Sequence, residues 1–213
     1  MIRHHLTDSM MIAYAAGTLP EAFALVAATH VSLCDDCRVR LGAFEVVGGA
    51  VLDSDDDFAP MDSGVEACFA RQVVPTVVAP TVQARRSGIL PAPLAAYVAG
   101  GLDAVKWRPL GMGVRQAILP TSKYASARLL YIPAGAAVPD HGHRGTELTL
   151  VLQGAFRDDS DRFGPGDVEV ADEQMQHIPV AEAGVDCICL AASDAPLRFK
   201  DWLPRLLQPI FRI

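Results

Sequence analysis

The pattern of apolar and polar residues divides the chain into two regions of different texture. Over the first fifty residues, capping and helix-breaking residues punctuate apolar stretches, which is typical of helices. Thr7 or Asp8 can cap a first helix, and Gly17 ends it. Pro20 opens a second helix after a very short turn, and this helix runs toward His30.

A third helical stretch is predicted over residues 36–52. Its apolar residues Val39, Phe44, Val46 and Val47 are spaced too loosely for one clean stripe. We therefore expect a helix with more than one apolar surface to bury.

The stretch that follows predicts a hinge, a short helix and a linker. The Asp-rich run 53–57 is typical of a solvated hinge. Ser63 and Glu66 form a capping box ahead of a short fourth helix, on which Cys68 is a core or interface residue. Prolines and the Arg85-Arg86 pair make residues 75–93 a linker. We expect a helical domain with this linker over 1–90 and a second domain over 94–213.

From about residue 95 the pattern changes to short strand-like runs separated by Gly and Pro turns. These runs cover residues 128–132, 148–152, 167–170 and 187–190. Short strands with such turns predict an antiparallel sandwich or small barrel. The expected fold class is α+β with two domains, a helical bundle followed by an antiparallel β-barrel.

Charge and cysteine usage narrow the possible environments and partners. The net charge of −7 is concentrated in the first half and argues against direct binding to nucleic acid. It suits a basic partner protein, although a modest negative charge also simply keeps a protein soluble. Five cysteines, without a signal-peptide pattern, favour a reducing cytoplasm over a disulfide framework. The longest uncharged stretch, 89–102, is too short to cross a membrane.

Five of the six histidines fall into two metal-ligand patterns, the first of which lies near the start. Cys34 and Cys37 span one helical turn, and His30 lies about one turn before Cys34. His5, or its neighbour His4, can supply a fourth ligand. Two nitrogens and two sulfurs complete a tetrahedral, structural Zn²⁺ site, which can add roughly 10 kcal/mol to folding. The alternative is a pair of small buried or redox-active cysteines with incidental histidines.

The second pattern lies in the strand-rich region. His141 and His143 share a strand face, and Glu147 has the same parity if the strand stays regular. With His177 from another strand, three imidazoles and a carboxylate suit Zn²⁺, Fe²⁺, Mn²⁺ or Ni²⁺. The alternative is a polar strand mouth without a metal.

Cys187 and Cys189 also share one strand face and are expected close to the interior of the barrel. A thiolate beside a bound metal is a target for oxidation or an alternative ligand. The competing interpretation makes both cysteines small core residues.

The first ligand set resembles that of the zinc-binding anti-sigma domain, in which an upstream histidine precedes His-x3-Cys-x2-Cys. The matching residues are His5, His30, Cys34 and Cys37. The resemblance implies a zinc-stapled helical bundle that wraps around an extracytoplasmic-function sigma factor and covers its RNA polymerase-binding surfaces. A fourth helix beyond a hinge often completes this clamp.

The second ligand set has the spacing of the first cupin motif, which here reads Gly135-x5-His141-x-His143-x3-Glu147-x6-Gly154. The second cupin motif departs from its usual pattern. The turn Gly164-Pro165-Gly166-Asp167 is present, but Glu169 stands where a histidine is usual. This departure leaves His177 as the expected ligand and weakens any transfer of enzymatic activity.

Both halves, in this order, resemble the ChrR-type anti-sigma factors over nearly the whole chain. The opening stretch 2–8 and the stretch 13–19 strengthen the match. The resemblance implies a cytoplasmic 1:1 complex with a sigma factor, released when the cupin half responds to singlet oxygen or related oxidants. It also implies two zinc sites, of which the cupin site has the less certain metal. The competing function is a metal-dependent cupin enzyme, a dioxygenase or isomerase, with a helical appendage.

Overall fold

The computed structural model describes residues 1–54, 64, 69–70, 89–98 and 100–199. The predicted fourth helix with Cys68, most of the Asp-rich hinge and most of the linker lie outside the described residues. Three helices come first, followed by a short helical turn and a strand-rich unit. The helical elements are α1 (Asp8–Ala15), α2 (Glu21–Leu33), α3 (Asp35–Asp53), α5 (Ala92–Ala95) and a 3-10 turn at Leu102–Ala104.

The helix boundaries follow local capping chemistry. Of the two candidate caps of α1, Thr7 is the N-cap, and its hydroxyl accepts a hydrogen bond from the Met10 amide. Gly17 follows the helix with a φ of +66°, a conformation that favours glycine. Cys34 alone separates α2 from α3. The two helices therefore meet at a sharp corner that contains a predicted metal ligand.

Within the described residues, the second unit is built from twelve antiparallel strands in three sheets. The largest sheet has the order β1-β2-β3-β11-β5-β8, and the smaller sheets have the orders β10-β6-β7 and β12-β4-β9. The strands are β1 (Arg108–Gly111), β2 (Val114–Leu119), β3 (Ser126–Ile132), β4 (His141–Gly142), β5 (Glu147–Gln153), β6 (Phe156–Arg157), β7 (Arg162–Phe163), β8 (Val168–Ala171), β9 (Gln176–His177), β10 (Val180–Ala181), β11 (Cys187–Ser193) and β12 (Arg198–Phe199).

The expected closed barrel is not formed within the part of the chain that the structure describes. The strands of the two smaller sheets are only two residues long, so their ladders end before they reach the large sheet. Proline explains part of this shortness, because Pro139, two residues before β4, and Pro179, between β9 and β10, have no amide hydrogen to donate. The observed architecture is α+β, with helices covering an open antiparallel sheet.

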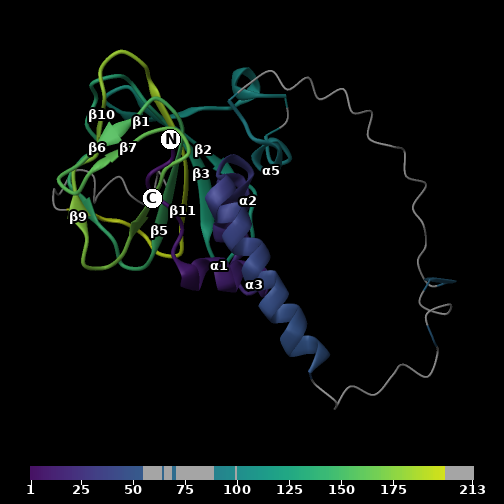
Figure 1. Ribbon diagram of the computed structural model, residues 1–213. Coiled ribbons are helices and arrows are strands. Elements are labelled where there is room, and N and C mark those ends of the chain that lie inside the picture. Colours follow the sequence, from purple (N-terminus) through teal and green to yellow (C-terminus); the bar gives the residue numbers. More distant parts are fainter. Residues whose placement is uncertain (55–63, 65–68, 71–88, 99, 200–213) are drawn as a thin grey trace.

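The helices and the large sheet share one hydrophobic core. Helix α2 packs against β11, β5 and β3, as the ribbon view shows (Figure 1). Side chains alternate along these strands, and one face points to the helices while the other lines a cavity. Each fully buried leucine of the shared core contributes about 1.5–3 kcal/mol. Its members include Leu6, Met11, Phe23 and Val26 from the helical part and Leu129, Leu148, Leu150 and Leu190 from the sheet.

The far half of α3 extends away from this core (Figure 1). Its buried residues, Cys37 and Leu41, both lie in the first two turns. No helix among the described residues is long and apolar enough to cross a membrane.

Candidate metal centres

The four predicted ligands of the first site lie together. One ligand atom each from His5, His30, Cys34 and Cys37 falls within a set whose members are all within 4.8 Å of one another. The Nε2 of His30 is 3.2 Å from the Sγ of Cys37, and the Nδ1 of His5 is 3.3 Å from the Sγ of Cys34. A tetrahedral zinc ion needs N···S separations of about 3.6 Å. The donor set therefore fits Zn²⁺ with only small adjustments.

Secondary structure explains how these ligands converge. His30 lies in the last turn of α2, Cys34 at the corner and Cys37 in the first turn of α3. His5 comes from the segment that precedes α1. Its neighbour His4 points elsewhere, with its Nε2 3.5 Å from Asp161 and its ring tilted by 41° against the ring of Phe163.

The electrostatics of the first site suit a bound cation. Burial and the neighbouring Cys34 raise the pKa of Cys37, so two adjacent thiolates require a compensating positive charge. Burial lowers the pKa of His30, although the Gly166 carbonyl opposes this shift. The neutral imidazole donates from Nδ1 to the carbonyl oxygen of Gly166 at 2.8 Å. Its Nε2 lone pair is thereby aimed at the sulfurs.

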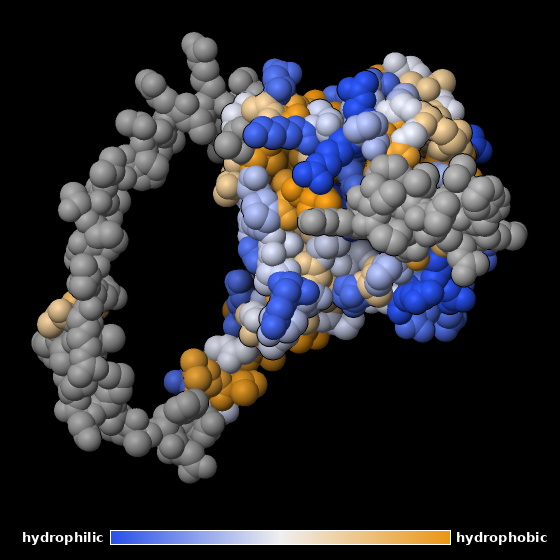
Figure 2. Space-filling view, turned by 180° about the vertical axis from the view of Figure 1, so that it is seen from behind, coloured by the Kyte–Doolittle hydropathy of each residue, from blue (hydrophilic) through white to orange (hydrophobic). Residues whose placement is uncertain are grey.

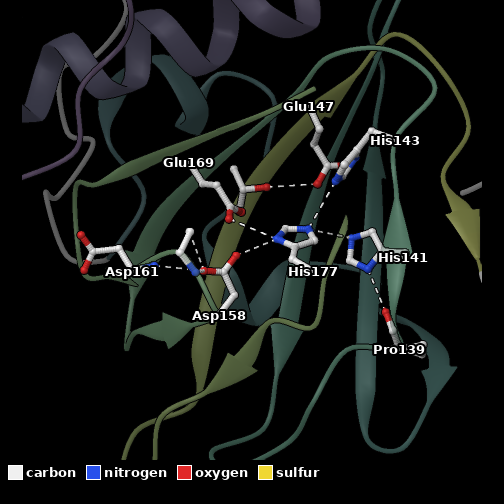
Figure 3. A network of polar contacts seen from close by, with 10 residues as sticks. Pro139, His141, His143, Glu147, Asp158, Asp161, Glu169 and His177 are labelled. Atoms are coloured by element: carbon white, nitrogen blue, oxygen red, sulfur yellow. Dashed lines mark hydrogen bonds and ion pairs between the residues drawn. The ribbon is translucent and has the colours of Figure 1, made fainter. Parts of the chain in front are cut away.

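The second site brings together three predicted histidines. His141, His143 and His177 each offer one nitrogen within a set whose members are all within 4.8 Å of one another. The Nε2 of His177 lies 3.2 Å from that of His141 and 3.3 Å from that of His143 (Figure 3). Three nitrogens bound tetrahedrally at about 2.0–2.1 Å from a metal would be about 3.3 Å apart. The spacing therefore matches a metal-binding triad.

Hydrogen bonds at the opposite ring nitrogens orient two of these histidines. His141 donates from Nδ1 to the carbonyl oxygen of Pro139 at 2.8 Å. His177 donates from Nδ1 to Asp158 at 2.9 Å and faces Glu169 at 3.2 Å. The two Nε2 atoms consequently face each other at 3.2 Å, a contact that either a proton on His177 or a metal ion between the rings can satisfy. A metal ion would replace the proton of His177 and meet all three Nε2 atoms at once.

The pKa of His177 is shifted in the opposite direction from the pKa values of His141 and His143. It lowers the pKa of both His141 and His143 to about 4, which keeps these imidazoles in the neutral form that binds metals. Burial also lowers the pKa of His177, but Glu169 and Asp158 outweigh it and raise the value to about 9. The two carboxylates thus favour positive charge at this position.

Glu147, the predicted carboxylate ligand, lies beside this triad and outside the set of atoms within 4.8 Å (Figure 3). It accepts a hydrogen bond from the Thr149 hydroxyl at 3.3 Å, and burial raises its pKa to about 7 against the opposing effect of Arg128. Its role as a ligand stays a prediction.

Sequence reasoning missed two carboxylates. Asp158 and Glu169 form a second cluster of potential ligand atoms with His177. The position of Glu169, three residues after Gly166, is the one at which the second cupin motif usually has a histidine, so a signal for it was present. Asp158 stands in a turn among other acidic residues, and no spacing pattern distinguishes it.

Cys187 and Cys189 share one strand face, as predicted, with 3.5 Å between their Sγ atoms. Both side chains are fully buried. The hydrogen bond to Cys187 and burial raise the pKa of Cys189 well above that of an ordinary thiol. The neutral thiol is therefore the resting form of Cys189, and a redox role for the pair stays a prediction.

Comparison with known proteins places these features in a family. The ChrR Cupin-like domain family matches residues 96–195. The chain is 59% identical over 212 residues to the anti-sigma-E factor ChrR of Cereibacter sphaeroides, covering 100% of this chain and 99% of that protein. The crystal structure of Rhodobacter sphaeroides SigE in complex with the anti-sigma ChrR is similar with a TM-score of 0.80 and 56% identity. That match covers 91% of this chain and 100% of the solved chain.

The alternative of a metal-dependent cupin enzyme does not hold, because the full-length relative is an anti-sigma factor. The match to this relative covers the helices, the corner at Cys34 and the strand-rich unit. The order of helices followed by strands is also the α+β order expected from the sequence. The chain belongs to the ChrR family of anti-sigma factors.

Proposed function

We propose that this protein sequesters an extracytoplasmic-function sigma factor in a 1:1 complex in the cytoplasm, and that its cupin part releases the sigma factor on an oxidative signal. The relative in the similar crystal structure is bound to the sigma factor SigE. In this proposal, residues 1–90 form the sigma-binding part with its linker, residues 94–213 form the sensor, and neither binds nucleic acid directly.

The exposed apolar face of α3 is the observation that carries the binding proposal. Five aliphatic side chains on this helix are between 61% and 75% exposed. At about 100° per residue, Val39, Val46, Val47 and Val51 lie within an arc of about 140° on the helix, and Leu52 adds apolar surface on the adjoining side near the free end. A contiguous apolar stripe in water is costly unless a partner covers it. The five residues, called the α3 stripe below, are Val39, Val46, Val47, Val51 and Leu52.

The shape of α3 suits docking into a groove of a partner. Its second half projects from the body of the protein, and apolar surface gathers at its free end (Figure 2). An amphipathic helix that lays such a stripe into an apolar groove is a common mode of recognition. The acidic balance of the helical half suits a partner with a basic surface.

Co-purification with the sigma factor tests this proposal. The double substitution Val46→Glu and Val51→Glu should reduce sigma affinity by at least a hundredfold, because two charges would enter an apolar contact. Folding and metal content should be unchanged, since both side chains are exposed. Arg38→Gln, an exposed change on the first turn of the same helix, is the matched control. Wild-type sigma affinity in the double variant would refute the role of the stripe.

Direct contacts between the first metal centre and the cupin loops support the release proposal. The amides of Arg3 and His4 donate to the Oδ1 of Asp167 at 2.6 and 2.9 Å. The Val168 amide donates back to the His4 carbonyl at 3.2 Å. This segment leads directly into His5, so the loop before β8 holds the chain next to a zinc ligand.

The same loop holds a second ligand of the first centre. The carbonyl of Gly166 accepts the Nδ1–H of His30, as described above. A Cβ atom at Gly166 would lie 2.5 Å from the Cδ1 of Ile2, and the φ of Gly166 is +91°. Only glycine fits this close approach without displacement.

The loop before β8 and the turn that contains Asp158 also reach the second metal centre. Glu169, just beyond the loop, faces His177, and so does Asp158. Asp161, three residues after Asp158, pairs with His4 at 3.5 Å. A change of ligation or charge at His177 would therefore act on loops that also position His5 and His30.

The coupling free energy needed for release is similar in size to the free energy of one or two hydrogen bonds. A hundredfold loss of sigma affinity requires about 2.7 kcal/mol of coupling. A hydrogen bond to a charged group contributes about 1.5–3 kcal/mol, so rearranging one or two of the Asp167 contacts is sufficient. A Zn²⁺ ion in each centre would supply a fixed positive charge and hold its ligands together. The identity of the ion in the second centre is part of the proposal.

A further inference from the structure

The face of the large sheet that points away from the helices encloses a cavity of about 1020 Å³. A metal-bound water occupies about 30 Å³, so the cavity is far larger than a metal centre requires. Its size is that of pockets that hold small organic molecules. His141, His177 and Glu169 line one part of it, and the remainder extends across β3 and β2.

One end of this cavity is apolar. Its wall is formed by the turn between β1 and β2, the ends of β2 and β3, and the segment before β4. No charged side chain contributes to this end among the lining residues that the structure describes. Such a surface binds hydrocarbon by releasing water. The residues of this apolar end are Leu110, Met112, Val114, Leu130, Ile132, Val138 and Phe156.

The positively charged side chain of Arg128 lies next to the apolar end. The partly buried side chain of Arg128 lines the cavity, and its guanidinium donates to the amide oxygen of Gln116 at 3.2 Å and to the hydroxyl of Ser126 at 3.0 Å. Both acceptors are neutral, and the nearby Glu147 carboxyl, whose pKa is raised to about 7, compensates the charge of the guanidinium only in part. Burial lowers the pKa of Arg128, although Glu147 opposes this. An anion bound there would relieve the cost of desolvating the charge.

The floor beside this cation is open. Arg128 pairs across the sheet with Ala191, and Ala191 pairs with Thr149 on the next strand. Thr149 in turn pairs with Glu169. Because residues paired in this way share a face, a small methyl group separates Arg128 from the polar groups near the metal centre. Arg128, Ala191, Thr149 and Glu169 all line the cavity.

We propose that this cavity binds an amphipathic monocarboxylate, with the carboxylate on Arg128 and the hydrocarbon chain in the apolar end. Charge selects the head group and apolar area selects the tail. This site goes beyond anti-sigma activity, and its binding is measurable on the full chain without a sigma factor. Failure of ligand binding would therefore leave the sigma-binding proposal standing, and the reverse also holds.

Calorimetric titration of the metal-loaded full-length protein with hexanoate, octanoate, decanoate and dodecanoate tests the proposal. Affinity should rise about fourfold with each added methylene, as expected for burial worth about 0.8 kcal/mol per CH₂. Decanol should bind more weakly than decanoate, because it does not carry the charge that Arg128 recognises. Absence of binding across the series, or affinity independent of chain length, would overturn the proposal.

Two substitutions assign the binding to this cavity. Arg128→Met should lower decanoate affinity at least tenfold and leave decanol affinity nearly unchanged. Arg115→Met is the matched control, because Arg115 lies on the same sheet but its guanidinium is over the Tyr131 ring on the opposite face. Ala191→Leu should weaken both ligands by filling the floor. Wild-type binding in both cavity variants, with folding verified by circular dichroism, would also overturn the proposal.

Discussion

The two metal centres of this protein differ in what surrounds them. The first has two nitrogens and two sulfurs from one helical corner and the segment before it, and three of its four ligands are buried. The second has three nitrogens. Two carboxylates lie at the Nδ1 side of His177, and a large cavity adjoins the centre. A closed donor set is typical of a structural site, whereas an open one can meet a small molecule. The contrast agrees with the proposal that the first centre holds the fold and the second responds to the signal.

The largest expected effect is loss of the first centre. Cys37→Ser should remove one of two bound zinc ions and lower the free energy of unfolding by several kcal/mol, because a structural zinc contributes roughly 10 kcal/mol of apparent binding free energy. Sigma capture should be lost with it. Metal analysis and thermal unfolding measure both quantities. Retention of two ions would break the comparison of the centres.

A matched pair of histidine variants sharpens the same point. His5→Gln should lose the first ion, whereas His4→Gln should keep it, since only His5 lies with the cysteines. Metal content of the two purified variants distinguishes these outcomes. Equal loss in both variants would contradict the assignment of His5.

The second centre should be separable from sigma binding. His143→Ala should lose the second ion and keep the first, with sigma affinity within about tenfold of wild type. Release of the sigma factor from the purified complex on illumination with a photosensitiser should be abolished. Normal release by this variant would show that the second centre is not the sensor.

Disruption of the connecting loop should give a smaller effect. Asp167→Asn keeps the volume of the side chain but removes the charge that accepts the Arg3 and His4 amides. Both ions should remain, and light-induced release should become at least tenfold slower. Asp159→Asn, an exposed change in a nearby turn, serves as the control. Equal release rates in the two variants would argue against coupling through this loop.

The smallest expected change in metal binding among these variants of the ligand set is that of Glu147→Gln. Because the Glu147 carboxylate lies outside the triad, metal affinity of the second centre should fall by about 10–100-fold rather than be lost. Competition with a chelator measures this change. Complete loss of the ion, as in His143→Ala, would establish Glu147 as a ligand after all.

Local chemistry determined much of this protein from its sequence alone. The Thr7 cap, the break at Gly17 and the placement of Cys34 and Cys37 within one turn depend on residues near each other in the chain. The alternation of β3, β5 and β11 likewise follows from a period of two. The helices, the strands and the candidate ligand residues were therefore predictable, although their role as ligands stays a prediction.

Only the tertiary structure decided how these elements meet. The hydrogen bond from His30 to Gly166 joins residues 136 positions apart, and no local pattern encodes it. The open sheet, the position of Glu147 beside the triad and the cavity near Arg128 all depend on packing between distant strands. Such contacts form where apolar surfaces bury one another, and the contribution of each residue then depends on partners far along the chain.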